Sequence, residues 1–96
     1  MTSEHANPVL HAQLLLTRIV QTLVKDERVV RVDAETSAAE TVLRLHVAMK
    51  DVGKVIGKEG RIASSVRTIL AALGAKEGVR FRLNIATAEG MPTQAG

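Results

Sequence analysis

The chain has 96 residues, enough for one domain and few for two, and carries a formal charge of +3. It contains no cysteine, which excludes disulfide bonds, thiolate metal sites and cysteine nucleophiles. No apolar run reaches the ~18 residues of a membrane span, and the N-terminus (MTSEHANP) lacks the basic start and apolar stretch of a secretory signal. We therefore expect a cytoplasmic protein that does not enter a membrane.

The charge is unevenly distributed. Residues 50–82 carry eight Lys or Arg and three Asp or Glu, a net +5, whereas residues 1–49 and 83–96 each carry a net −1. A basic segment suggests an anionic partner, although a merely solvated surface has the same composition. Phe81 is the only aromatic residue, so the core must be built from aliphatic side chains.

Hydrophobic periodicity predicts the element order helix, strand, strand, helix, helix, strand. Asn7 and Pro8 mark the start of the first helix, Asp51 is expected to cap the second, and Gly74 is expected to end the third. The predicted elements are a helix from residue 9 to about residue 25, strand 28–33, loop 34–40, strand 41–48, helix 52–56, loop 57–60, helix 61–73 and strand 79–85.

The second and third strands alternate between apolar and polar residues, so each presents one face to a core. The residues expected on the core side are Leu43, Leu45, Val47, Val79, Phe81, Leu83 and Ile85, and those on the opposite side are Val42, Arg44, His46, Arg80, Arg82 and Asn84. The simplest arrangement packs all three helices on the apolar face of the sheet.

These elements predict an α+β fold with a three-stranded mixed sheet. The first two strands form an antiparallel hairpin, and the right-handed crossover between the second and third strands makes these two parallel. We expect one domain over residues 8–86, with flexible tails at 1–7 and 87–96.

The stretch VIGKEGRI, residues 55–62, has the glycines and lysine of a phosphate site. A Walker loop needs GxxxxGK followed by Ser or Thr, but only three residues separate Gly53 from Gly57, and Glu59 stands where the hydroxyl is required. A GxxG turn instead lets a ligand approach closely, because glycine has no Cβ. At the amino end of a helix, flanked by Lys58 and Arg61, it favours binding of a sugar-phosphate backbone over catalysis.

VIGKEGRI, preceded by Asp51-Val52-Gly53-Lys54, resembles the signature of KH domains. The element order α-β-β-α-α-β is that of the type II KH fold, and the resemblance over roughly residues 9–85 is greatest to small bacterial single-KH-domain RNA-binding proteins. It implies a non-enzymatic, general RNA-binding or RNA-chaperone-like regulator that clamps about four single-stranded nucleotides. It implies no cofactor and no small-molecule substrate.

By position, the resemblance assigns residues to the RNA site. Gly53 and Lys54 would line a shallow apolar groove for the bases, while Arg61 and Arg67 would face phosphate or base edges. The implied RNA-binding residues are Gly53, Lys54, Gly57, Lys58, Glu59, Gly60, Arg61 and Arg67. Glu59 departs from the basic or neutral residues that the family favours in the loop, so we expect weak binding with little sequence preference.

Two alternatives remain open from the sequence. Surplus leucines in the first helix, and the resemblance itself, suggest a protein-interaction module. Its partners would be a second copy or a larger KH-containing RNA-binding protein linked to cell-envelope growth, division and cell shape. The arginines of the polar sheet face could form a second anion-binding surface or a partner site, although a solvated sheet is the simpler interpretation. The dispersed histidines and the serines at 64 and 65 do not suggest a metal site or a nucleophile.

Overall fold

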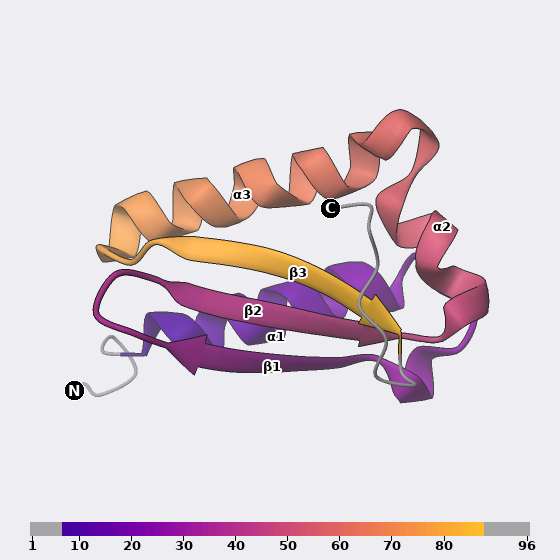
Figure 1. Cartoon of the computed structure of the whole chain (residues 1–96), viewed down its shortest axis with the longest axis horizontal. Helices are drawn as coiled ribbons and strands as arrows, with labels where there is room; N and C mark the ends of the chain where they lie inside the picture. Colours follow the sequence, from indigo (N-terminus) through magenta and orange to yellow (C-terminus); the bar gives the residue numbers. More distant parts are fainter. Residues whose placement is uncertain (1–6, 88–96) are drawn as a thin grey trace.

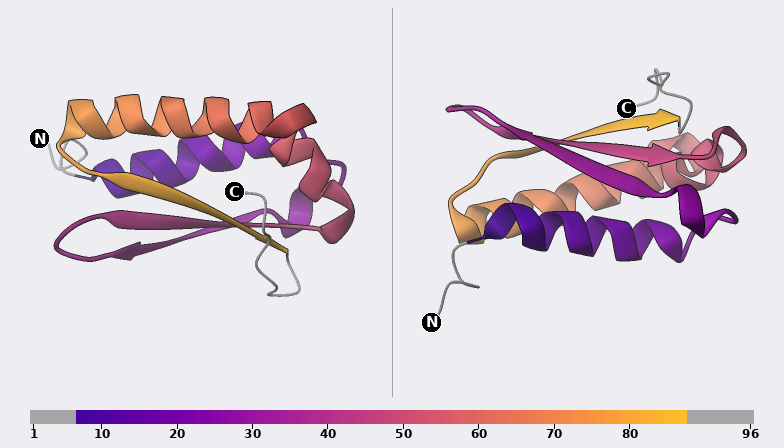
Figure 2. Two further views of the ribbon diagram at one scale, coloured as in Figure 1. Left: turned by 45° about the horizontal axis from the view of Figure 1, so that its top comes forward. Right: turned by 90° about the horizontal axis from the view of Figure 1, so that it is seen from below.

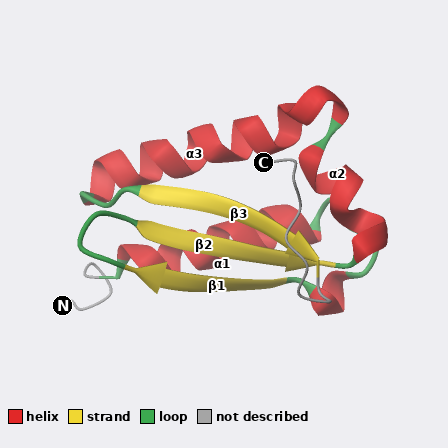
Figure 3. Cartoon of the chain, viewed as in Figure 1, coloured by secondary structure: helices red, strands yellow, loops and turns green. Residues whose placement is uncertain are grey.

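A computed structural model describes residues 7–87 of the chain. Its elements follow the predicted order (Figures 1 and 3). The helices are α1 (Pro8–Gln21), α2 (Val52–Ile56) and α3 (Arg61–Glu77), the strands are β1 (Arg31–Thr36), β2 (Thr41–Val47) and β3 (Phe81–Thr87), and short 3₁₀ turns occupy Glu27–Val29, Met49–Asp51 and Lys58–Gly60.

The sheet has the order β1-β2-β3, with β1 and β2 antiparallel and β2 and β3 parallel, as predicted. α1 and α3 run along one face of the sheet, and α2 lies at the end where β2 and β3 terminate (Figure 2). This α+β arrangement, with its three-stranded mixed sheet, is consistent with a type II KH fold.

Helix α1 begins as its sequence predicts. The side chain of Asn7 accepts a hydrogen bond of 3.0 Å from the amide of Leu10, and Pro8 is the first helical residue. An Asn cap satisfies an amide that has no partner within the helix, and proline at this position loses no hydrogen bond. The buried face of α1 then carries Ala12, Leu16 and Val20 into the core.

The core is aliphatic and lies between the helices and the apolar face of the sheet. All three helices contribute to it, α2 through Val55, whereas Phe81 is only partly buried at the margin. The buried apolar residues of this cluster are Ala12, Leu16, Val20, Val24, Leu43, Leu45, Val47, Val55, Ala63, Val66, Leu70, Leu83 and Ile85.

The bounds of two strands differ from the prediction. β1 begins at Arg31 rather than at residue 28, and β3 spans Phe81–Thr87 rather than residues 79–85. Pairing with β2 sets both, because residues 31–36 oppose 46–41 and residues 81–87 lie beside 41–47. The polar segment Ala34–Thr36, predicted as loop, is therefore strand, since cross-strand pairing outweighs local propensity.

Gly74 does not end the third helix, as its sequence position suggested. It lies buried inside α3, and a Cβ at this position would stand 2.2 Å from the carbonyl oxygen of Val79. The helix ends three residues later, where Gly78 adopts the left-handed conformation with φ of 76°. Gly74 is thus a close-packing residue, and Gly78 has the stop role expected of a glycine.

One further expectation changes. His46, expected on the exposed face with Arg44, is buried, with 9% of its surface exposed, and its Nε2 lies 3.1 Å from the Asp33 carboxylate. The predicted tails 1–7 and 87–96 fall outside the described residues, except for Asn7, the cap of α1, and Thr87, the last residue of β3.

Candidate nucleic-acid interface

The GxxG loop joins α2 to α3 at one end of the molecule (Figure 1). Val55 is buried in the core, so α2 is anchored directly before the loop. The amide of Gly57 donates to the carbonyl of Gly53 at 2.9 Å, which closes α2. Gly57 has φ of 78° and ψ of 173°, a conformation essentially restricted to glycine.

The loop is also tightly packed beneath its first glycine. A Cβ at Gly57 would stand 2.6 Å from Cγ1 of Ile62, whereas one at Gly60 would meet no atom within 4 Å. Ile62 therefore supports the loop from below, while Gly60 is open. Gly57 is required by both backbone conformation and packing, and Gly60 by conformation alone.

Left-handed backbone continues through the loop. Glu59 has φ of 57° and Gly60 has φ of 74°, and the Gly60 amide donates to the Gly57 carbonyl at 3.1 Å. Glu59 is the one residue other than glycine with positive φ among residues 7–87. These turns direct the chain into α3, whose first amides have no partner within the helix and, with the helix dipole, favour an anion.

The charged side chains at the loop differ in whether they have an ion-pair partner. The Glu59 carboxylate forms an ion pair of 3.1 Å with Arg61, and both side chains are well exposed. Lys58 has no ion-pair partner among residues 7–87. Within the described loop, Lys58 is therefore the cation whose charge is not compensated by a neighbouring carboxylate.

Lys54, which precedes the loop, forms an ion pair with a buried carboxylate. Its ammonium lies 3.2 Å from the carboxylate of Asp51, which is completely buried, while half of the Lys54 side chain is exposed. Asp51 also accepts a hydrogen bond from the Asp26 amide at 3.0 Å. That backbone hydrogen bond lowers the pKa of Asp51, outweighing burial, which acts in the opposite direction.

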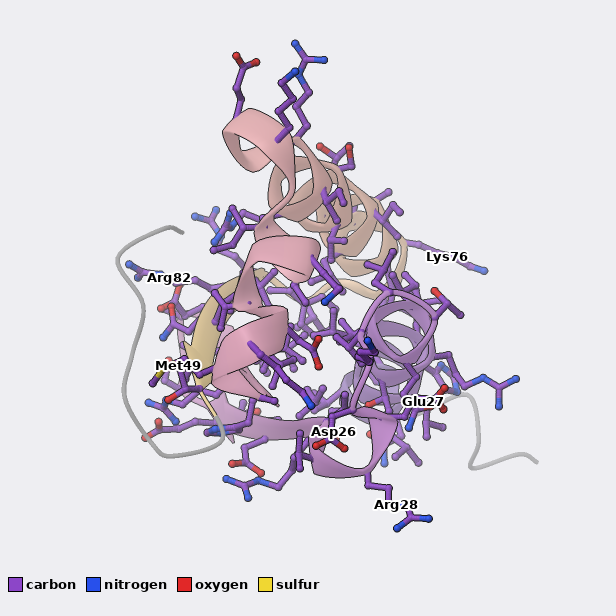
Figure 4. The ribbon with its side chains drawn as sticks, turned by 90° about the vertical axis from the view of Figure 1, so that its right-hand side faces the viewer. Asp26, Glu27, Arg28, Met49, Lys76 and Arg82 are labelled. Carbon is purple, nitrogen blue, oxygen red and sulfur yellow. The ribbon has the colours of Figure 1, made fainter. Side chains whose placement is uncertain are left out.

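Asp51 is therefore not the side-chain cap that the sequence predicted. It occupies the position before α2 but makes no capping hydrogen bond to that helix. Its carboxylate reaches instead to the connection between α1 and β1. Figure 4 views this end of the molecule and shows Asp26 in that connection. The sequence shows an Asp before the GxxG segment, but it cannot show the role of this Asp, because the Asp26 amide that it binds lies 25 residues away.

The other two residues assigned to the site, Gly53 and Arg67, lie on α2 and α3. Gly53 has open space where a Cβ would be, so the surface of α2 is shallow there. Arg67, one turn and a half further along α3 than Ile62, is half-buried and donates at 3.4 Å to the carbonyl oxygen of Leu83 in β3. Arg67 thus bridges α3 and β3 in this structure.

The open sheet face offers no comparable site in the described part of the chain. The three arginines within its strands each have an acidic partner: Arg31 with Asp33, Arg44 with Glu35, and Arg82 with Glu40. Arg80, predicted for this face, lies before β3 and has no ion-pair partner among residues 7–87. Figure 4 shows Arg82 on this face, on the opposite side of the molecule from Lys76. The face is charged but internally compensated, which favours a solvated sheet over a second anion-binding surface.

Residues 7–87 provide neither a metal site nor a membrane-spanning helix. No group of three or more His, Asp or Glu is placed there to hold a metal ion. None of the helices in that range combines the length and apolarity needed to cross a membrane.

Comparison with known proteins agrees with this geometry. The sequence model described as KhpA/KhpB, KH domain matches residues 13–85, which include β1, β2, the GxxG loop, α3 and most of β3. The chain belongs to the KhpA/KhpB KH-domain family. The match confirms the resemblance to KH domains and places the VIGKEGRI stretch inside the family's domain.

Individual members of the family are clearly similar to the chain. A protein of Borreliella burgdorferi named RNA-binding protein KhpA is 42% identical over 71 residues, 74% of this chain and 87% of its own length. Proteins of the same name are 42% identical in Clostridium acetobutylicum, covering 95% of that protein, and 37% identical in Bacillus subtilis, covering 93%. The chain therefore spans nearly the whole length of these relatives.

Proposed function

We propose that this chain is a non-enzymatic protein that binds single-stranded RNA, with its Gly57–Gly60 loop holding the sugar-phosphate backbone. The observation that carries the proposal is the loop itself. It has left-handed backbone at three positions, lies at the amino end of α3 and contains Lys58, a cation without an ion-pair partner among residues 7–87. Relatives that share the fold are named RNA-binding proteins.

Each assigned residue has a physical role in the proposal. Gly57 and Gly60 allow close approach of a phosphate, and Lys58 supplies the main long-range attraction. Lys54 presents an anchored ammonium, of which one donor is used by Asp51 and the others remain for ligand. Arg67 lies further along α3, where releasing the Leu83 carbonyl would free its guanidinium for a base or phosphate.

The scarcity of aromatic side chains predicts the character of the binding. With one aromatic residue in the chain, partly buried against the core, the site has no platform for stacking bases. Affinity therefore depends on backbone contacts, which carry no sequence information. We infer weak, general binding of about four nucleotides, suited to an RNA-chaperone-like role in the cytoplasm, without a cofactor.

A salt titration tests the proposal. Labelled single-stranded RNA is titrated with the wild type, Lys58→Asp and, as a matched control, Lys76→Asp, whose side chain is exposed in the last turn of α3 far from the loop. We expect Lys58→Asp to weaken binding at least about threefold and to reduce the salt slope by about one, with Lys76→Asp near the wild type. Equal affinities of all three proteins, or no salt dependence, would contradict the proposal.

A second candidate function, protein association, is favoured by apolar residues on the outer side of α1. Leu10 is 45% and Leu14 is 56% exposed, and they lie four residues apart, on the same side of the helix. The partner would be a second copy of the chain or another KH-domain protein. Light scattering of the wild type and Leu14→Lys at high micromolar concentration tests self-association, and a strict monomer for both would exclude the homodimer.

A further inference from the structure

The ion pair between Glu59 and Arg61 lies within the proposed phosphate site. Oε1 of Glu59 is 3.1 Å from Nη2 of Arg61, with the side chains 67% and 78% exposed. Glu59 reaches this position because its own backbone is left-handed and the chain turns into α3 immediately afterwards. The carboxylate is thus presented to the first side chain of the helix.

A carboxylate and a phosphate use the same features of a guanidinium. Both accept charge-assisted hydrogen bonds from its planar N–H groups, often two at a time. A phosphate that approaches Arg61 from the loop must therefore share or replace the contact that Glu59 already makes. The exposure of both side chains allows this exchange, because nothing buried holds the Glu59 carboxylate in place.

The pair between Asp51 and Lys54 provides a contrast within the same site. The Asp51 carboxylate is fully buried and is also bound by the Asp26 amide, so it cannot leave Lys54. An ammonium has three donors and keeps free ones when a single carboxylate oxygen is bound. Asp51 therefore holds its cation in place for a ligand, whereas Glu59 occupies the cation that a ligand would use.

We infer that Glu59 is an internal competitor for phosphate at Arg61, and that this competition sets the affinity of the site. The inference rests on the proposed function, since it requires that the loop bind a phosphodiester backbone. Removing the charge of Glu59 should strengthen RNA binding, and the gain should depend on Arg61. Simple repulsion between Glu59 and RNA would instead give a gain that is independent of Arg61.

A double-mutant cycle separates these two effects. Dissociation constants for a labelled single-stranded RNA are measured for the wild type, Glu59→Gln, Arg61→Gln and the double variant, after thermal melts confirm that each is folded. Because exposed ion pairs are weak, we expect Glu59→Gln to tighten binding about two- to fivefold. In the Arg61→Gln background the same change should have almost no effect.

Glu27→Gln is the matched control. Glu27 is an exposed acid in the turn after α1, and Figure 4 shows it on the side of this end away from the GxxG turn. Its neutralisation changes the net charge equally but should leave affinity nearly unaltered, because solvent and salt screen distant charges. A tightening as large as that of Glu59→Gln would attribute the effect to net charge and overturn the inference.

The remaining outcomes are also decisive. Unchanged or weaker binding by Glu59→Gln, or an equal gain with and without Arg61, overturns the competition while leaving the proposed RNA binding intact. RNA binding that is detected for Glu59→Gln but not for the wild type would support the competition. An absence of RNA binding by both the wild type and Glu59→Gln overturns the competition together with the proposed function.

Discussion

Oδ2 of Asp51 accepts a hydrogen bond of 3.0 Å from the backbone amide of Asp26, 25 residues earlier in the chain. The contact ties the connection after α1 to the start of α2, and therefore to the loop that follows. The carboxylate is completely buried, and its charge is balanced by Lys54 at 3.2 Å. A buried charge is tolerated only when it is paired and hydrogen-bonded, so this arrangement is a sensitive point of the fold.

We predict that Asp51→Ala destabilises the protein strongly, lowering the melting temperature by roughly 5–15 °C. The Asp26 amide would lose its acceptor, and Lys54 would lose its partner. Asp26→Ala is the control, because it keeps the backbone amide and should change the melting temperature little. Equal melting temperatures for both variants and the wild type, measured by circular dichroism, would show that the contact contributes nothing.

The same carboxylate predicts a pH dependence. The Asp26 hydrogen bond lowers the pKa of Asp51 in the folded state below its ordinary value of 3.8. Its ionisation therefore stabilises the fold fully above that value, and the stabilisation is lost as the pH falls through the lowered pKa. The difference in unfolding free energy between the wild type and Asp51→Asn should be constant near neutral pH and shrink below about pH 4. If this difference in unfolding free energy instead grew as the pH fell, the pKa of Asp51 would not be lowered in the folded state.

Two helical glycines should respond oppositely to alanine. In Gly74→Ala the new Cβ would stand 2.2 Å from the Val79 carbonyl oxygen, a backbone atom that cannot swing aside. We expect a loss of about 1–3 kcal/mol in the free energy of unfolding. Gly53→Ala adds a methyl group in open space and should gain about 0.5 kcal/mol through reduced freedom of the unfolded chain. Urea denaturation of the two variants measures both, and similar changes would refute the packing role of Gly74.

The two loop glycines should also differ from each other. Gly57→Ala combines a glycine-only backbone conformation with a contact of 2.6 Å to Ile62, and should cost about 2–4 kcal/mol. Gly60→Ala has left-handed φ but open space, and should cost about 1–2 kcal/mol. Both are compared by urea denaturation. A larger loss for Gly60→Ala would mean that Ile62 does not support the loop.

The outcome for the glycines shows where local pattern is insufficient. The spacing of Gly57 and Gly60 within VIGKEGRI identified the loop, because a turn between two apolar helices has a clear signature. Gly74 has the same appearance as a helix stop, yet it is buried inside α3 because the carbonyl of Val79 packs against it. A glycine needed for close approach and one needed for positive φ cannot be distinguished until the packing partner is known.

The strand bounds and the burial of His46 depended on partners elsewhere in the chain in the same way. Thr36 became strand because it pairs with Thr41, and His46 was buried beside Asp33 although its position in the alternation predicted exposure. For Glu59, the sequence identified a residue discordant with a phosphate site. The structure added that its carboxylate contacts Arg61.

The sequence by itself determined the order of elements, the aliphatic core, the mixed sheet, the GxxG loop and membership of the KH family, because each follows from periodicity or from a short contiguous motif. Only the tertiary structure decided the strand register, the end of α3, the burial of Asp51 and the pairing of each charge near the loop. The strand register and the burial of Asp51 depend on contacts between residues far apart in the chain, such as Asp51 and Asp26, which no local pattern encodes. The end of α3 and the ion pairs near the loop join residues close in sequence, but they depend on backbone and side-chain geometry that the pattern does not specify.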